Sequence, residues 1–255
     1  MIKIERFENN NGIYISGDYE DLYFLREAVS SLAGDKDSYD GYEEVHGVVQ
    51  KFVFELLHTY RAERDSFKTN CDTPCYKFEM YFPEAIFVAD ALNDYIMLWE
   101  SEENYTYKIE ERTSSVIDKM RDRHFIDKAF IRFFQASVWN AVREAAGDER
   151  FEKIGELKDY EAICKKGDLR YRGYCKDWID IMNIRLLNSY DKEECIAEMI
   201  GNFAVRGEEY LSKERAMKEH FKDGNISLYI DLLSELQYPS DEDEEYGSME
   251  ELLDI

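Results

Sequence analysis

The chain has 255 residues, of which 44% are hydrophobic and 15% aromatic, and this apolar content excludes wholesale disorder. Its 56 acidic and 32 basic residues give a formal net charge of −24. Because binding to a phosphate backbone depends on Lys and Arg, we expect no direct nucleic-acid binding, and the same charge opposes attachment to anionic membranes. Pro and Gly are scarce, which favours helices over an all-β fold with many turns.

The N-terminal residues predict a β-hairpin followed by a helix. Residues 2–7 alternate apolar and charged side chains, residues 9–12 favour a turn, and residues 13–15 are again β-prone. Asp18 can cap a helix whose apolar residues recur every three or four positions and which ends near Gly34.

The middle of the chain predicts two helices around a strand. The apolar spacing indicates a helix over residues 42–61 and a connection over residues 64–75. Alternating aromatic residues predict a strand over residues 76–82, and Pro83 suits the first position of a helix. That helix, residues 84–99, is apolar nearly all round, so we expect it to lie deep in the fold. Truncating its core residues, as in Leu92→Ala or Trp99→Ala, should cost about 2–5 kcal/mol of stability.

The second half of the chain is predicted to be helical after one further strand. Alternation predicts this strand over residues 105–109. A long helix then runs from about residue 113 to residue 146, where Gly147 ends it. Four more helices are expected, over residues 171–187, 191–205, 208–222 and 226–236.

These elements predict one α+β domain over residues 1–238 that is predominantly α-helical. A short N-terminal β-hairpin and one or two further strands pack on a helical bundle. Residues 239–255 form an acidic, flexible tail, and truncation after Pro239 should leave folding nearly intact. The chain shows no signal peptide and no membrane-spanning run, so we expect a cytoplasmic protein with reduced cysteines.

Four segments resemble an uncharacterised bacterial protein family. They are ISGDYEDL at residues 15–22, PEAIFV at 83–88, ALNDYI at 91–96 and IMNIRLLN at 181–188. The resemblance covers residues 1 to about 238 and leaves out the acidic tail. It implies a shared fold and a bacterial or phage origin, and it brings no activity, ligand or catalytic residue with it.

Two carboxylates on the apolar helix are the best candidates for catalysis. Asp90 and Asp94 lie one helical turn apart, and their proximity could raise one pKa and produce a general acid. The alternative is a narrow solvated stripe, or carboxylates neutralised by Arg121, Arg123 or Arg132.

Histidine and cysteine patterns do not predict a metal site. Residues 43–46 and 55–58 each read Glu-x-x-His, but one helix cannot direct both pairs at one ion. The cysteine pair at residues 71 and 75 lacks the second pair that zinc needs. No phosphate-binding or nucleotide-binding loop occurs. We therefore expect no metal and no cofactor, while a Cys/His pair brought together by the fold stays open.

The tail could bind a partner. Residues 248–251 have the form of a capping box, and apolar residues then fall on one helical face. An acidic arm that ends in an amphipathic turn suits a groove with a basic rim, although the tail could equally be a solubilising end or dock on its own domain. The candidate residues are Asp241, Glu242, Asp243, Glu244, Glu245, Met249, Leu252 and Leu253.

Two functions are compatible with these features. The preferred hypothesis is a non-enzymatic protein that binds another protein, one with a basic surface. Its sharper version is an inhibitor or nucleic-acid mimic with carboxylates in rows. The alternative is an enzyme or small-molecule binder with a pocket between the β elements and the helices, lined by Asp90 and Asp94 or by a Cys/His pair.

Overall fold

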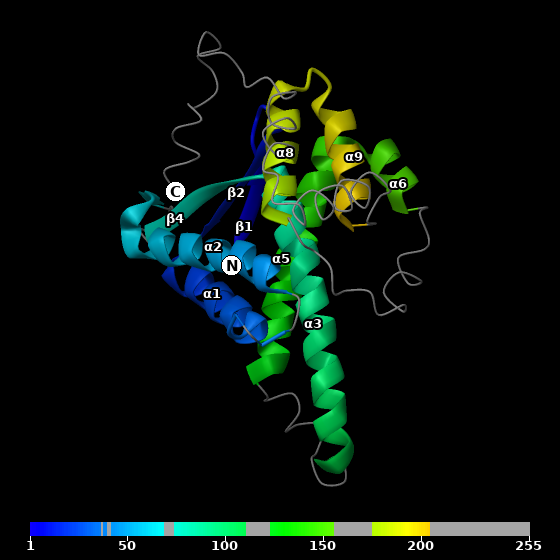
Figure 1. Ribbon diagram of the computed structural model, residues 1–255. Helices are drawn as coiled ribbons and strands as arrows, with labels where there is room; N and C mark the ends of the chain where they lie inside the picture. Colours follow the sequence, from blue (N-terminus) through cyan, green and yellow to red (C-terminus); the bar gives the residue numbers. More distant parts are fainter. Residues whose placement is uncertain (37, 40–41, 69–73, 111–122, 156–174, 205–255) are drawn as a thin grey trace, which may run out of the picture.

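The computed structural model describes residues 1–36, 38–39, 42–68, 74–110, 123–155 and 175–204 (Figure 1). The described chain is mostly helical and contains a four-stranded antiparallel sheet. This confirms the predicted α+β class. The strands, in chain order, are β1 (Lys3–Arg6), β2 (Gly12–Gly17), β3 (Asp65–Lys68) and β4 (Pro74–Tyr81).

The sheet has the strand order β1-β2-β4-β3, so the predicted hairpin β1–β2 forms one side of it. Its register places Ile15 opposite Ile4 on one side and opposite Phe78 on the other. Ile15 and Phe78 are buried, which shows that this face of the sheet is the core face. Gly12 allows the close pairing of β2 with β4, because a Cβ atom there would lie 2.3 Å from the carbonyl oxygen of Met80.

Helix α1 (Tyr19–Ala33) begins and ends where the sequence predicts. The Asp18 carboxylate accepts a 2.9 Å hydrogen bond from the backbone N–H of Asp21, and the Asp21 carboxylate accepts one from the N–H of Asp18. This reciprocal pair satisfies two N–H groups at the start of the helix. The helix ends at Gly34, whose φ of 61° would strain other residues.

The predicted helix over residues 42–61 changes character near its end. Helix α2 (Glu43–His58) is followed by the single π-helical turn η1 (Thr59–Glu63), in which Ala62 has a φ of 60°. The Thr59 hydroxyl donates a 2.6 Å hydrogen bond to the carbonyl of Glu55, one turn earlier. The expected connection over residues 64–75 instead contains β3. Its four residues are extended because they pair with β4.

Helix α3 (Phe82–Glu110) includes residues 105–109, so the predicted strand there is wrong. No Gly or Pro follows Pro83 in this helix, and extending an existing helix costs less than starting a separate strand. The first half of α3 is buried as predicted, including Ala85, Ile86 and Leu92.

The remaining described helices are α5 (Arg123–Ala146), α6 (Asp148–Gly155), α8 (Cys175–Asn188) and α9 (Lys192–Ala204). They confirm the predicted helices over residues 171–187 and 191–205 and the end of the long helix at Gly147, whereas α6 was not predicted. The predicted start of the long helix and the predicted helices over residues 208–222 and 226–236 lie outside the described residues. No described helix is both long and apolar enough to cross a membrane.

Helix α5 is central to the arrangement in Figure 1. It packs against α1 on one flank and α3 on the other, and it also contacts β1, α6 and α9. One continuous hydrophobic core joins the sheet to α1, α2, α3, α5, α8 and α9. Helix α5 therefore lies between the N-terminal elements α1 and β1 and the later helices α3, α6 and α9.

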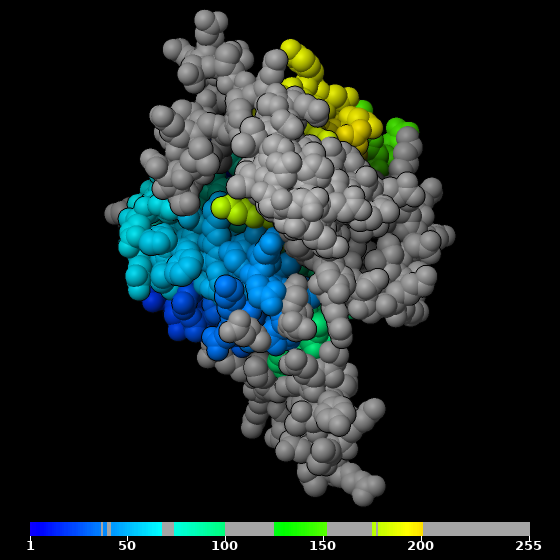
Figure 2. Space-filling model, viewed as in Figure 1, coloured from blue at the N-terminus to red at the C-terminus, as the bar shows by residue number. Residues whose placement is uncertain are grey.

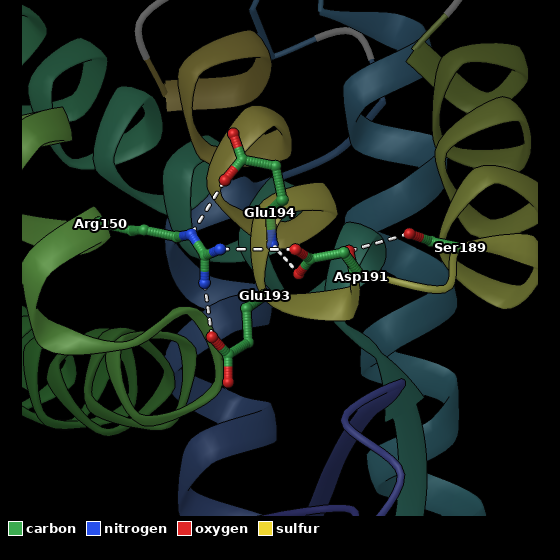
Figure 3. A network of polar contacts seen from close by, with 5 residues as sticks. All are labelled: Arg150, Ser189, Asp191, Glu193 and Glu194. Atoms are coloured by element: carbon green, nitrogen blue, oxygen red, sulfur yellow. Dashed lines mark hydrogen bonds and ion pairs between the residues drawn. The ribbon is translucent and has the colours of Figure 1, made fainter.

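A cluster of charges ties α6 to the beginning of α9 (Figure 3). The Arg150 guanidinium lies 2.5 Å from Glu193, 2.9 Å from Glu194 and 3.4 Å from Asp191. Asp191 also caps α9 by accepting a 2.9 Å hydrogen bond from the N–H of Glu194, while the Ser189 hydroxyl donates to the carbonyl of Asp191. This cluster has a structural explanation, since it joins two helix ends that are far apart in the sequence.

Candidate functional site

Large apolar side chains are exposed on the surface that α1 shares with α5. On α1, Tyr19 is 51% exposed and Phe24 is 46% exposed. On α5, Ile126 and Phe133 are exposed on the same helical face as Phe130. Part of α1 is visible at the lower left edge of the molecule in the space-filling view (Figure 2). Neighbouring exposed apolar groups of this kind mark interaction surfaces.

Five rings form a continuous series, which we call the aromatic row, and it runs from the buried Tyr60 to the exposed Tyr19 and Phe24. Tyr60 of η1 meets Tyr19 edge to face, with 5.2 Å between ring centroids. Tyr19 stacks on Tyr23 at 5.9 Å, Tyr23 meets Phe24 at 5.7 Å, and Phe24 stacks on Phe130 at 5.9 Å. The row thus joins η1, α1 and α5.

The geometry of α1 explains why its three rings, Tyr19, Tyr23 and Phe24, lie away from the buried stripe of the helix. Tyr19 and Tyr23 are four residues apart and lie one above the other, with ring planes only 7° apart. The opposite side of α1 carries Leu22, Leu25 and Val29, which are buried. The sequence shows this second, aromatic face of α1, but our sequence analysis used only the buried stripe and missed the row.

The Tyr60 end of the row is bordered by two guanidinium groups. Burial raises the pKa of Tyr60, and the nearby Arg26 and Arg61 act in the opposite direction. Arg26 forms an ion pair with Glu27. Arg61 is exposed and makes no ion pair within the described part of the chain. This end of the row therefore combines two guanidinium groups with two carboxylates: Glu27, and Glu63, whose pKa the hydrogen bond from His58 and the charge of Arg61 both lower.

The predicted catalytic carboxylates lie in the interior. Asp90 is 4% exposed and Asp94 is 2% exposed, so the interpretation of a solvated stripe is wrong. Neighbouring helices cover α3 on several sides, and the hydroxyl of Tyr42, the residue just before α2, donates a 3.3 Å hydrogen bond to the Asp94 carboxylate. Buried carboxylates need such partners, and they serve structure as readily as chemistry.

A polar seam joins α3 to α5 beside these aspartates. The Gln135 amide donates a 2.6 Å hydrogen bond to the carbonyl of Ala89, and Arg132 donates to Asn93 at 2.7 Å and to Gln135 at 3.0 Å. Of the predicted arginine partners, Arg132 thus bonds to neutral groups. The side chains at positions 121 and 123 lie outside the described residues.

Within the described ranges, no group of three or more His, Cys, Asp or Glu could hold a metal ion.

The Glu-x-x-His residues make local contacts at the two ends of α2. Arg64 forms a two-point ion pair with Glu55, with both N–O distances at 3.1 Å. His58 lies 2.5 Å from Glu63, and this hydrogen bond lowers the pKa of Glu63. His46 contacts the backbone carbonyl at the end of α1, at 3.1 Å. These contacts fix the ends of α2 and the π-helical turn.

Three cysteines in the described part of the chain form no disulfide bond: Cys75, Cys175 and Cys195. Burial raises the pKa of Cys75 and of Cys195, which lowers the fraction of reactive thiolate. These two thiols therefore lack the electrostatic activation of a catalytic nucleophile. Cys71 and Cys164 lie outside the described residues.

The tail candidates also lie outside the described residues. They are Asp241, Glu242, Asp243, Glu244, Glu245, Met249, Leu252 and Leu253. Their role in binding stays a prediction.

Fold and surface together define a mostly helical α+β protein with an exposed aromatic row. The chain belongs to the family described as "Domain of unknown function (DUF6904)", whose model matches residues 2–243. This match supports the resemblance seen in the sequence at the level of a family of unknown function, and it reaches a few residues past position 238. No curated protein and no solved structure matches the chain.

Proposed function

We propose that this protein acts by binding a protein partner, and that the aromatic row is the contact surface. The observation that carries the proposal is the continuity of the row. Five rings from three elements touch in series, and two of them, Tyr19 and Phe24, are about half exposed. Tyr and Phe supply a large contact area with few rotatable bonds, so they are enriched where interfaces bind most tightly.

The row is also held in place before any partner arrives. The Phe24 ring rests on Phe130 of α5, and Tyr19 and Tyr23 are stacked. Ordering such side chains during binding would cost about 0.5–1.5 kcal/mol for each one. A row that is already ordered avoids much of that cost, which supports a role in recognition.

The alternative of a nucleic-acid mimic has less support from the described surface. Its carboxylates are interleaved with bases, as in the ion pairs of Lys51 with Glu84 and of Arg64 with Glu55. Arg150 likewise faces three acids at the start of α9. A mimic needs rows of unpaired carboxylates at phosphate spacing, so we favour a partner that offers apolar side chains to the row and basic ones to the acidic exterior.

The enzyme alternative would use buried groups. Asp90 and Asp94 are enclosed by helices, and Asp94 is engaged by Tyr42. This placement favours a structural role for both carboxylates over a role in catalysis.

Site-specific photo-crosslinking in the native cell tests the proposal. A benzophenone amino acid replaces Phe24 in one full-length variant and Phe54 in a matched control, because Phe54 is 56% exposed but lies on α2, outside the row. We expect one protein to be joined to position 24 and not to position 54. Mass spectrometry identifies that protein, and calorimetry with the purified pair then measures the dissociation constant.

In that assay Phe24→Ala should weaken binding by roughly thirtyfold, the effect typical of an interface hot spot. Phe54→Ala should leave the dissociation constant within about twofold, since most residues outside hot spots contribute little. Equal crosslinking from both positions, or equal loss of affinity in both variants, would contradict the assignment of the row.

A further inference from the structure

Helix α5 carries two apolar stripes on opposite sides. The first is buried in the core and consists of Ile131, Phe134, Val138 and Val142. The second, which we call the outer stripe, is exposed along its length and consists of Ile126, Ala129, Phe133 and Ala136. Its positions recur every three or four residues, which is the spacing of a seam that receives a second helix. The buried stripe holds α5 in the fold, whereas the outer stripe leaves apolar surface in water.

The side chains of the outer stripe alternate in size. Ile126 is 48% exposed and Phe133 is 38% exposed, whereas Ala129 and Ala136 carry one methyl group each. Small residues between large ones leave room for the side chains of a second helix, which can approach to an axial distance of about 8–10 Å. Phe130 lies beside the stripe on the flank toward α1, so the stripe continues the aromatic row along α5.

Arg132 borders the outer stripe on the flank toward α3 and is exposed. Its Nη1 atom donates both to the side-chain oxygen of Asn93 at 2.7 Å and to that of Gln135 at 3.0 Å. These bonds orient the guanidinium group through one nitrogen, and neither partner is an acid. The Nε and Nη2 atoms form the other edge of the group, and with the same two atoms Arg64 binds the carboxylate of Glu55. Arg132 is therefore oriented to receive a carboxylate.

The charge of α5 favours an acidic group from another protein over a second copy of the chain. The helix has four basic and two acidic residues, although the whole chain carries a net charge of −24. Of the two acids, Asp127 is buried and Glu144 lies about two turns beyond Ala136. In a two-fold dimer through the outer stripe, two basic helices would face each other and two highly acidic chains would repel.

We infer that the partner binds as an amphipathic helix that lies along the outer stripe, with an acidic residue opposite Arg132. This inference rests on the proposed function and adds the chemistry of the partner. The apolar side chains of that helix pack between Ile126 and Phe133 and reach the aromatic row. Its carboxylate binds the Nε and Nη2 atoms of Arg132 and so fixes the register, while basic residues elsewhere on the partner suit the acidic exterior of the chain.

Selection of displayed peptides on the purified full-length chain tests the inference. Each phage displays one helix of about 21 residues, in which the seam positions are Leu and the other positions are random mixtures of Ala, Glu and Lys. We expect the selected peptides to bind Phe133→Asp roughly thirtyfold more weakly than the unmodified chain. Phe54→Asp, at an exposed position on α2, is the matched control and should bind them with unchanged affinity. Circular dichroism verifies that both variants fold.

The charges of the selected peptides test Arg132 separately. At one position beside the seam, Glu should exceed Lys by about twofold to fivefold, the effect of an exposed ion pair. Selection on Arg132→Glu should reverse this preference at the same position. Lys51→Glu, which reverses an exposed charge on α2, should leave the preference unchanged.

Four outcomes would overturn the inference. They are a selection that yields no binder, equal loss of affinity in the Phe133→Asp and Phe54→Asp variants, and a charge preference that Arg132→Glu does not reverse. The fourth is a dimer in analytical ultracentrifugation that Phe133→Asp dissociates, since a second copy would then cover the outer stripe.

The partner found by crosslinking from position 24 separates failure of this inference from failure of the proposed function. If Phe24→Ala weakens that partner but Phe133→Asp and Arg132→Glu do not, the inference is wrong and the proposed function stands. If peptides are selected as expected but no protein crosslinks to position 24, the proposed function is wrong.

Discussion

Apolar side chains are usually buried and polar ones exposed, and the two flanks of α5 each depart from this rule in a different way. Toward α1, the helix carries Phe130 within a row of rings that is partly open to water. Toward α3, it carries the polar side chain of Gln135, which is buried and hydrogen-bonded to the carbonyl of Ala89. One flank exposes apolar groups and the other buries polar ones.

The difference between the flanks indicates which one is available for function. On the polar seam, Gln135 and Arg132 have hydrogen-bond partners within the fold. On the aromatic row, the exposed areas of Tyr19 and Phe24 contribute nothing to folding. Because burial of these exposed apolar areas does not contribute to folding, it can contribute to the binding of a partner.

We expect the largest loss of stability when a core side chain is truncated, and this loss is the reference for variants on both flanks. Leu92→Ala removes a fully buried side chain from α3, and we expect it to lower the free energy of unfolding by about 2–5 kcal/mol. Phe24→Ala, although it removes a larger side chain, should cost only about 1 kcal/mol, because half of the ring is already in water. Urea unfolding of both variants measures the two values. A similar loss in both would show that the row is part of the core.

Loss of the seam's buried hydrogen bond should have an intermediate effect. Gln135→Ala removes the buried side-chain hydrogen bond to the carbonyl of Ala89 and truncates a buried side chain, so we expect a loss of about 1–3 kcal/mol. Asn140→Ala is the matched control, since its exposed amide on the same helix bonds to Glu144 one turn away and should contribute under about 0.5 kcal/mol. If both variants unfold at the same urea concentration, the seam does not stabilise the protein and the contrast between the flanks fails.

Local signals predicted most of this fold. Asp18 and Gly34 define the ends of α1 through capping and a positive φ, and both effects depend only on nearby residues. A strand that forms by pairing with a distant segment leaves no such local signal. Strand β3 exists because Asp65 and Phe67 face β4, and nothing within its four residues indicates a strand. In α3, alternation over residues 105–109 misled in the other direction, since the helix already formed continues through it.

The candidate site was less accessible to sequence reasoning. The spacing of Tyr19 and Tyr23 is visible, but Tyr60 and Phe130 reach the row only through the packing of η1 and α5 on α1. The aspartates were identified, yet their burial depends on the helices that cover α3. Sequence patterns define which faces exist, whereas tertiary packing decides which of them stays exposed.

The polar contacts between α6 and α9 are exposed, whereas those of the seam are buried. Comparing the two shows whether burial determines how much a polar contact stabilises the protein. Arg150 contacts three acids, but all four side chains reach solvent. We expect Arg150→Ala to lower the melting temperature modestly in dilute buffer and by less at high salt, because exposed ion pairs are screened. Arg143→Ala, which removes one 3.4 Å ion pair to Asp148, should have a smaller effect. A salt-independent loss in the Arg150 variant would mean that the cluster acts through packing.

The smallest expected effect concerns the turn that holds Tyr60 in the row. A hydrogen bond from His58 lowers the pKa of Glu63, so this carboxylate stabilises the fold at pH values above its pKa in the unfolded chain. That contribution disappears as the pH falls through the lower pKa of the folded state. We expect His58→Ala to raise the titration midpoint of Glu63, measured by NMR, whereas His46→Ala, which removes a contact at the other end of α2, should leave it unchanged. If the midpoint is the same with and without His58, this contact does not order the turn, and the position of Tyr60 depends on its ring contacts alone.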